Sequence, residues 1–130
     1  MIDHVSIGVA DIARSKHFYD AVLKPLGYDC LSNSPDSLGY GRGHVALWIL
    51  AVETPVPPDT RSGLHFCFAA PNCGSVRAFH AAALSSGGAD NGPAGLRADY
   101  GDNYFAAFAI DPNGYRIEAY CAAAQQENDE

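Results

Sequence analysis

The stretch His4-Val5-Ser6-Ile7-Gly8-Val9 returns in altered form as His65-Phe66-Cys67-Phe68-Ala69-Ala70, and this repetition decides the fold. A shift of 61 positions superimposes residues of matching class: His4 on His65, Val5 on Phe66, Ile7 on Phe68, Phe18 on Phe79, Leu23 on Leu84 and Gly27 on Gly88. Matches that span a strand, a helix and the glycine after it indicate an internal duplication. The chain is therefore expected to contain two copies of one structural unit.

Each copy begins with a strand and a helix. In the first copy, alternating side chains predict a strand over 2–9. Asp11 is a suitable N-cap for a helix that should end near Lys24, before Pro25. The corresponding predictions for the second copy are a strand over 64–70 and a helix over 73–86.

Three further segments complete each copy. In the first copy strands are predicted over 28–32, 37–41 and 44–51; in the second, an irregular or short-strand stretch to residue 96 precedes strands over 104–110 and 115–121. Each half therefore has the order β-α-β-β-β, in which one helix covers one face of a small, mostly antiparallel sheet. The prediction is an α+β fold with a first module 1–51, a Pro-rich linker 52–62, a second module 63–121 and an acidic tail 122–130.

The composition limits the classes of partner. A chain of 130 residues is long enough for one compact domain, and its net charge of −7 argues against nucleic acid and anionic membranes, which both need a basic patch. No apolar run approaches the roughly 18 residues of a membrane span, and the start lacks the pattern of a signal peptide. The four cysteines form no CxxC pair. We therefore expect reduced thiols in a cytoplasmic protein, with no zinc knuckle or redox dithiol.

A carboxylate follows a tight turn near the end of the second copy. Asp111-Pro112-Asn113-Gly114 has the composition of a turn, since Pro fixes one φ angle and Asn and Gly tolerate a positive one. In the strand that follows, Glu118 lies on the face opposite the apolar one. His4 and His65 lie on the same kind of face in their strands, so two imidazoles and one carboxylate are expected to converge if the modules face each other. Together they predict a three-ligand site for a divalent metal.

Two observations bear on the rest of this site. Aligning the glycines at 43 and 114 places Leu47 opposite Glu118 in the first copy, with Trp48 one residue further on, so the fourth equivalent position is expected to be apolar. Cys67 shares the face of His65, and we expect it to be a small buried hydrophobe. The competing interpretation is that each histidine is a hydrogen-bonded structural residue and that the carboxylate is solvated.

The segment from Asp90 to Asn103 is expected to be a long loop before an inner strand. Such a loop can act as a lid that brings Arg97 or Tyr100 to a substrate, or it can be an ordinary exposed connection. Tyr120 shares the face of Glu118 and is a third candidate for contact with a ligand. The sequence assigns no catalytic residue beyond these three candidates.

The sequence resembles the vicinal oxygen chelate superfamily, which comprises the glyoxalase I, bleomycin resistance and extradiol dioxygenase proteins. The resemblance covers residues 1–121 and rests on the histidine strands, on Phe18-Tyr19, and on the turn that leads into Ile117-Glu118. It implies paired modules that form a cupped mixed sheet around a metal, and substrates that chelate this metal through adjacent oxygens. In such proteins His4, His65 and Glu118 would be the matching ligands.

The resemblance implies several functions. A divalent-metal-dependent lyase, isomerase, thiol transferase or dioxygenase-like enzyme would act on a small oxygen-chelating substrate. Glyoxalase I generally uses an acidic fourth ligand that Leu47 or Trp48 cannot supply, which disfavours that activity. The alternatives are a non-catalytic protein that sequesters an aromatic or antibiotic ligand, as bleomycin-binding members do, and a metal-free remnant in which the three residues only pack.

The identity of the metal and the assembly remain open at this level. Two imidazoles and a carboxylate accept manganese, iron, nickel or zinc. A homodimer is expected, and the sequence leaves open whether His4 meets His65 and Glu118 of its own chain or of a partner.

Overall fold

The computed structural model describes residues 1–59 and 61–122, and the part it describes contains two modules with the same order of elements. The first module consists of β1 (Val5–Val9), α1 (Ile12–Leu23), the 3-10 turn η1 (Lys24–Leu26), β2 (Asp29–Ser34), β3 (Ser37–Arg42) and β4 (His44–Ala51). The second module consists of β5 (His65–Ala69), α2 (Cys73–Ser85), β6 (Ala89–Leu96), β7 (Tyr104–Ile110) and β8 (Arg116–Ala122).

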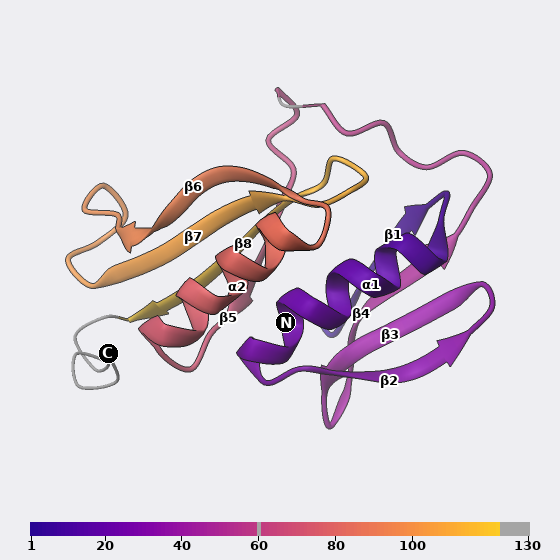
Figure 1. Cartoon of the computed structure of the whole chain (residues 1–130), viewed down its shortest axis with the longest axis horizontal. Helices are drawn as coiled ribbons and strands as arrows, with labels where there is room; N and C mark the ends of the chain where they lie inside the picture. Colours follow the sequence, from indigo (N-terminus) through magenta and orange to yellow (C-terminus); the bar gives the residue numbers. More distant parts are fainter. Residues whose placement is uncertain (60, 123–130) are drawn as a thin grey trace.

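Each module forms a four-stranded mixed sheet. The strand orders are β1-β4-β3-β2 and β5-β8-β7-β6; the first strand of each module runs parallel to the last, and the other neighbours are antiparallel. Figure 1 shows α1 and α2 side by side at the centre, with one sheet towards either side. The predicted α+β fold of two repeated β-α-β-β-β modules is confirmed.

Local capping explains the helix boundaries. The side chain of Asp11 accepts a hydrogen bond from the backbone N–H of Arg14 at 3.1 Å, as an N-cap does. α2 has a reciprocal capping box between Asn72 and Ser75. α1 ends at Leu23 and continues as η1, so the predicted end near Lys24 is confirmed.

One apolar core joins the modules. Phe18 of α1 and Phe79 of α2 are both fully buried in the same cluster. A Cβ atom added at Gly88 would lie 2.7 Å from Cε1 of Phe18, so the first helix packs directly against the backbone of the second module. The two modules are thereby joined through their helices.

A pair of tyrosines also connects the modules through the edges of their first strands. The hydroxyl of Tyr115 donates to the carbonyl of Gly8 on β1, and that of Tyr28 donates to the carbonyl of Ala69 on β5, both at 2.7 Å. Gly8 and Ala69 occupy equivalent positions of the sequence repeat. Each module therefore supplies a phenol to the same carbonyl of the other.

Several boundaries differ from the predictions. β1 begins at Val5 instead of residue 2, and the first half of the expected loop 90–103 is strand β6. β6 pairs with β7 through register shifts beside Gly92 and Gly95, so bulges accommodate a composition that resembles a loop. Residues 52–59 contain neither helix nor strand, and most of the predicted acidic tail lies outside the described residues. Within 1–59 and 61–122, no helix has the length and apolar character needed to cross a bilayer.

Candidate metal and ligand site

Glu118 is the buried carboxylate at the centre of the second sheet. Its neighbours Ile117 and Ala119 point into the core, so strand alternation places Glu118 on the opposite face, where it is only 2% exposed. Its Oε1 lies 3.1 Å from Nε2 of His65, and its Oε2 accepts a hydrogen bond from the hydroxyl of Tyr104 at 2.5 Å. Both carboxylate oxygens are therefore engaged by side chains from neighbouring strands.

Tyr104 is a site residue that the sequence analysis missed. Its ring packs 4.1 Å from that of Tyr120 and 5.2 Å from that of Tyr100, measured between ring centroids. Burial and the hydrogen bond to Glu118 raise the pKa of the Tyr104 phenol, so it remains a donor to the carboxylate. The available signal was strand parity, since Tyr104 shares the face of Phe108, whose backbone pairs with that of Glu118.

A cavity of about 690 Å³ opens beside Glu118. Two candidates from the sequence, Arg97 and Tyr100, line it together with His65, Tyr104 and Arg116, whereas Tyr120 contributes through its contact with Tyr104. This volume is in the range of small-molecule sites.

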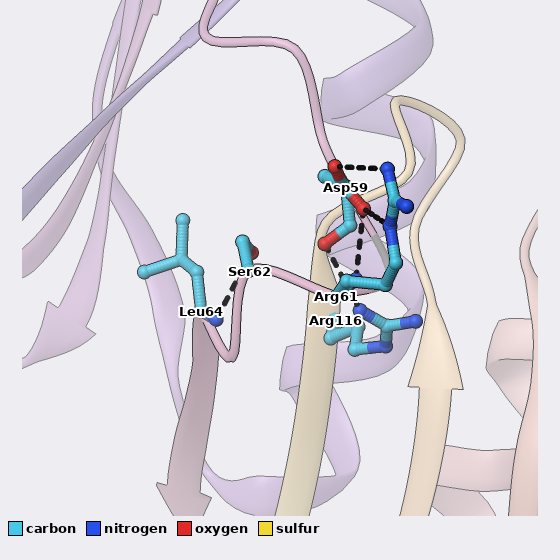
Figure 2. A network of polar contacts seen from close by, with 5 residues as sticks. All are labelled: Asp59, Arg61, Ser62, Leu64 and Arg116. Atoms are coloured by element: carbon cyan, nitrogen blue, oxygen red, sulfur yellow. Dashed lines mark hydrogen bonds and ion pairs between the residues drawn. The ribbon is translucent and has the colours of Figure 1, made fainter.

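The linker contacts Arg116, one of the residues that line this cavity. Figure 2 shows Asp59 beside Arg61 and Arg116. The carbonyl of Asp59 accepts from Nη1 of Arg116 at 3.4 Å, while hydrogen bonds from Arg61 hold the pKa of the Asp59 carboxyl below its usual value. The linker is thereby attached to the start of β8.

His4 lies apart from the other two predicted ligands. Its side chain is half exposed, and its Nδ1 lies 2.9 Å from a carboxylate oxygen of Asp3. It lines a second cavity of about 380 Å³, which His65 also borders. The structure thus brings His65 and Glu118 together but not His4, and residues 1–59 and 61–122 contain no group of three His, Cys, Asp or Glu side chains arranged to hold a metal.

The position equivalent to Glu118 in the first module is Trp48, so the predicted alignment on Leu47 is wrong. Glu118 pairs with Cys67, two residues after His65, and Trp48 pairs with Ser6, two residues after His4. The turns before β4 and β8 differ, since β3 and β4 shift register near Gly41, and the two glycines are therefore not equivalent. The absence of an acidic side chain at this position is unchanged.

Cys67 was predicted to be a buried hydrophobe, and this prediction is wrong. The residue is exposed and borders the second cavity. The thiol itself is partly desolvated, and this desolvation, together with the nearby charge of Glu118, raises its pKa to about 12. It is therefore a neutral thiol at neutral pH, on the face that carries the site.

Comparison with solved structures identifies the same fold in other proteins. A glyoxalase/bleomycin resistance protein from Albidiferax ferrireducens is 31% identical, with a TM-score of 0.77, over 91% of this chain and 95% of its own. A glyoxalase/bleomycin resistance protein/dioxygenase family enzyme from Burkholderia phytofirmans is 14% identical, with a TM-score of 0.68, over 93% of this chain and 98% of its own. The second likeness concerns the fold alone.

The family model of the glyoxalase/bleomycin resistance protein/dioxygenase superfamily matches residues 1–119. The chain belongs to this superfamily. Its members commonly bind divalent metals and small molecules, and they often form dimers. None of the curated proteins compared with the chain is significantly similar to it.

Proposed function

We propose that the protein is a divalent-metal-dependent enzyme acting on a small oxygen-chelating substrate, with His4, His65 and Glu118 as metal ligands. The observation that carries this proposal is the pairing of a buried carboxylate with an imidazole Nε2 at 3.1 Å in a cavity large enough for a small molecule. Imidazole nitrogen and carboxylate oxygen suit manganese, iron, nickel and zinc.

The residues fit such an ion in part. His65 and Glu118 lie on adjacent, hydrogen-bonded strands, so their side chains are presented by rigid backbone. His4 precedes β1 and is half exposed, and it is the ligand that must be brought to the other two. When bound, a divalent ion beside a single carboxylate would keep a net positive charge and polarise a substrate oxygen.

The chain's own side chains supply binding and orientation. Tyr104 donates to Glu118 and fixes the direction of its carboxylate, as partners of metal ligands do. Arg97 and Tyr100, which line the cavity, are the candidates for contact with the substrate. The reaction class stays within lyase, isomerase, thiol transferase and dioxygenase-like chemistry.

Metal stoichiometry tests this proposal. We expect about one ion per chain after dialysis of the purified protein against manganese, iron, nickel or zinc, measured by elemental analysis, and loss of that ion in Glu118→Ala. Glu53→Ala, which makes the same change at an exposed residue that does not line the cavity, is the matched control and should retain the ion. Absence of retained metal from the unmodified protein would contradict the proposal.

We further propose a homodimer in which His4 is contributed by the second copy. Mixing His4→Ala with Glu118→Ala protein distinguishes the arrangements, because a mixed dimer then contains one site with all three ligands. Recovery of about one ion per mixed dimer is the expected result. No recovery would mean that the three ligands come from one chain, or that the chain does not form dimers, which sedimentation of the same samples separates.

One observation favours the second candidate function, a non-catalytic protein that sequesters an aromatic or antibiotic ligand. Both oxygens of Glu118 already have partners, and a buried polar group that is satisfied in this way needs no ion. Such a protein should bind its ligand with the same affinity after chelation of metals, whereas the enzyme should lose activity.

A further inference from the structure

We propose that the cavity beside Glu118 takes a planar aromatic molecule that carries one carboxylate, with Arg97 and Arg116 binding the carboxylate. This inference rests on the proposed function, and deepens it, by naming the class of molecule that the same site takes. It is argued from the charge, the placement of the two arginines and the aromatic wall of the cavity.

The charge of the cavity differs in sign from that of the chain. Arg97 and Arg116 line the cavity, and Glu118 is its only carboxylate among the described lining residues. Neither arginine forms an ion pair within residues 1–59 and 61–122. Asp59, whose carboxylate acts on Arg116 from outside the cavity, is itself paired with Arg61. Among the lining residues, two guanidinium groups against one carboxylate leave a single positive charge, in a chain whose net charge is −7. A singly charged anion is the ligand that this arrangement complements.

The guanidinium of Arg97 is held in place before any ligand binds. Its Nη2 donates to the carbonyl of Pro93 at 2.5 Å, and its Cζ lies 5.3 Å from the centroid of the Phe108 ring. Cβ atoms added at Gly92 and Gly95 would lie 3.2 and 3.3 Å from its two terminal nitrogens, so these glycines provide the space in which it lies. A pre-organised guanidinium loses little conformational entropy when it binds a carboxylate.

Arg116, the first residue of β8, is the second arginine of the cavity. It lies on β8 two residues before Glu118, and its contact with the carbonyl of Asp59 is long at 3.4 Å. A contact of this length constrains the side chain weakly. Arg116 can therefore turn towards an anion in the cavity by giving up this one contact with the linker.

Aromatic rings form another part of the wall. Tyr100, Tyr104 and Phe108 all line the cavity, and the rings of Tyr100 and Tyr104 pack edge to face. Rings of this kind bind planar aromatic molecules by offset or edge-on stacking. A wall that carries both cations and aromatic rings favours an aryl carboxylate over an aliphatic acid or a neutral aromatic compound.

The test uses three probes that separate charge from aromaticity. Metal-stripped protein is titrated calorimetrically with 2-naphthoate, with 2-naphthamide, which has the same shape but no charge, and with cyclohexanecarboxylate, which has the charge but no aromatic ring. We expect 2-naphthoate to bind about tenfold more tightly than either of the others, the effect of one charge-assisted contact or one stacked ring. Equal binding of 2-naphthamide, or no binding of 2-naphthoate to metal-stripped and metal-loaded protein, would overturn the inference.

Arginine variants locate the contact. Arg97→Gln and Arg116→Gln should each weaken 2-naphthoate binding about tenfold. Arg14→Gln, which makes the same change in charge on α1, should bind 2-naphthoate as the unmodified protein does. If Arg97→Gln does not fold, Arg97→Lys takes its place, because it keeps the charge and removes the guanidinium fork. Unchanged affinity in both the Arg97 variant and the Arg116 variant would overturn the assignment.

Metal content measured on the same preparations separates this inference from the proposed function. Retained metal without 2-naphthoate binding overturns the inference and leaves the metalloenzyme standing. Binding of 2-naphthoate by a protein that retains no metal supports the inference and contradicts the metal proposal.

Discussion

Glu118 is a buried carboxyl residue, and each of its two oxygens has one side-chain partner. The loss of either partner should lower the stability of the fold. A buried carboxylate oxygen without a donor loses far more than the net contribution of the hydrogen bond itself. The hydrogen bond from the Tyr104 phenol is the shorter of the two contacts of Glu118. Tyr104 lies on β7, which pairs directly with β8, the strand of Glu118. Removal of either partner would therefore leave one buried oxygen of Glu118 without its donor.

Tyr104→Phe should therefore lower the stability of the metal-stripped protein. We expect the free energy of unfolding in urea to fall by about 1–3 kcal/mol, because one oxygen of Glu118 loses its donor. Tyr100→Phe removes an exposed hydroxyl from the same aromatic group and is the control. In a Glu118→Gln background the cost of Tyr104→Phe should shrink, and a cost that stays the same would mean that the hydroxyl acts through another partner, such as the Cys67 thiol.

At the scale of elements, the turn between β7 and β8 is organised by Asp111. Its carboxylate accepts hydrogen bonds from the Tyr19 hydroxyl at 2.5 Å and from the backbone N–H groups of Asn113 and Tyr115 at 2.9 and 2.8 Å. Burial nevertheless raises the pKa of Asp111 above 3.8, the value of the unfolded chain, and outweighs these bonds. Burial of the turn therefore disfavours the charged form of this carboxyl.

This charge gives stability a defined dependence on pH. Between 3.8 and the raised native pKa, the folded state binds more protons at Asp111 than the unfolded state, so the contribution of Asp111 to stability falls as the pH rises. The unfolding free energy of the unmodified protein minus that of Asp111→Asn should likewise fall as the pH rises. Denaturant titrations across this range measure it, and a difference that rises with pH would contradict the assignment.

The junction between α2 and β6 has no room for a side chain at Gly88. A Cβ atom at Gly88 would lie 2.7 Å from both Cε1 of Phe18 and the carbonyl of Ile110. Gly88→Ala should lower the free energy of unfolding by about 1–3 kcal/mol through overpacking. Gly95→Ala, whose nearest neighbour is the flexible end of Arg97, is the control and should change the unfolding free energy far less.

The limits of prediction from sequence follow from these elements. Period-two alternation and the repeat of His4 at His65 were sufficient for the two modules, and the boundaries 44–51 and 104–110 agree with β4 and β7. β6 was predicted only as an irregular or short-strand stretch, because Gly92 and Gly95 weaken the strand signal and bulges compensate for them only through pairing with β7. Local patterns carry no information on such pairing.

The candidate site was predictable where parity alone decides position. Parity correctly placed Glu118 on the face of His65, and the two side chains meet. It could not reveal the hydrogen bond from Tyr104, which reaches Glu118 diagonally from the adjacent strand β7. Nor could it reveal the register shift that makes Trp48 equivalent to Glu118. Nor could it locate His4 relative to the other ligands, since that depends on how whole modules pack.

At the scale of the whole molecule, the two modules depend on each other for burial. Phe18 of α1 and Phe79 of α2 belong to one core, and the turn at Asp111 in the second module bonds to Tyr19 in the first. A single module would expose much of this surface, so we expect the chain to unfold in one transition. Calorimetric and van't Hoff enthalpies should then agree, and a lower van't Hoff value would indicate that the halves unfold separately.

The tyrosine hydroxyls that cover Gly8 and Ala69 have a consequence for aggregation. β1 and β5 are both edge strands, and an uncovered edge is a template on which another chain can add a strand. Each half of the molecule thus blocks sheet growth on the other, and the duplication provides its own protection against fibre formation. Light scattering during incubation near the unfolding midpoint should show faster aggregation of a Tyr28→Phe, Tyr115→Phe double variant than of Tyr100→Phe. If the two variants aggregate equally fast, other side chains protect the edges of β1 and β5, and the phenols only join the modules.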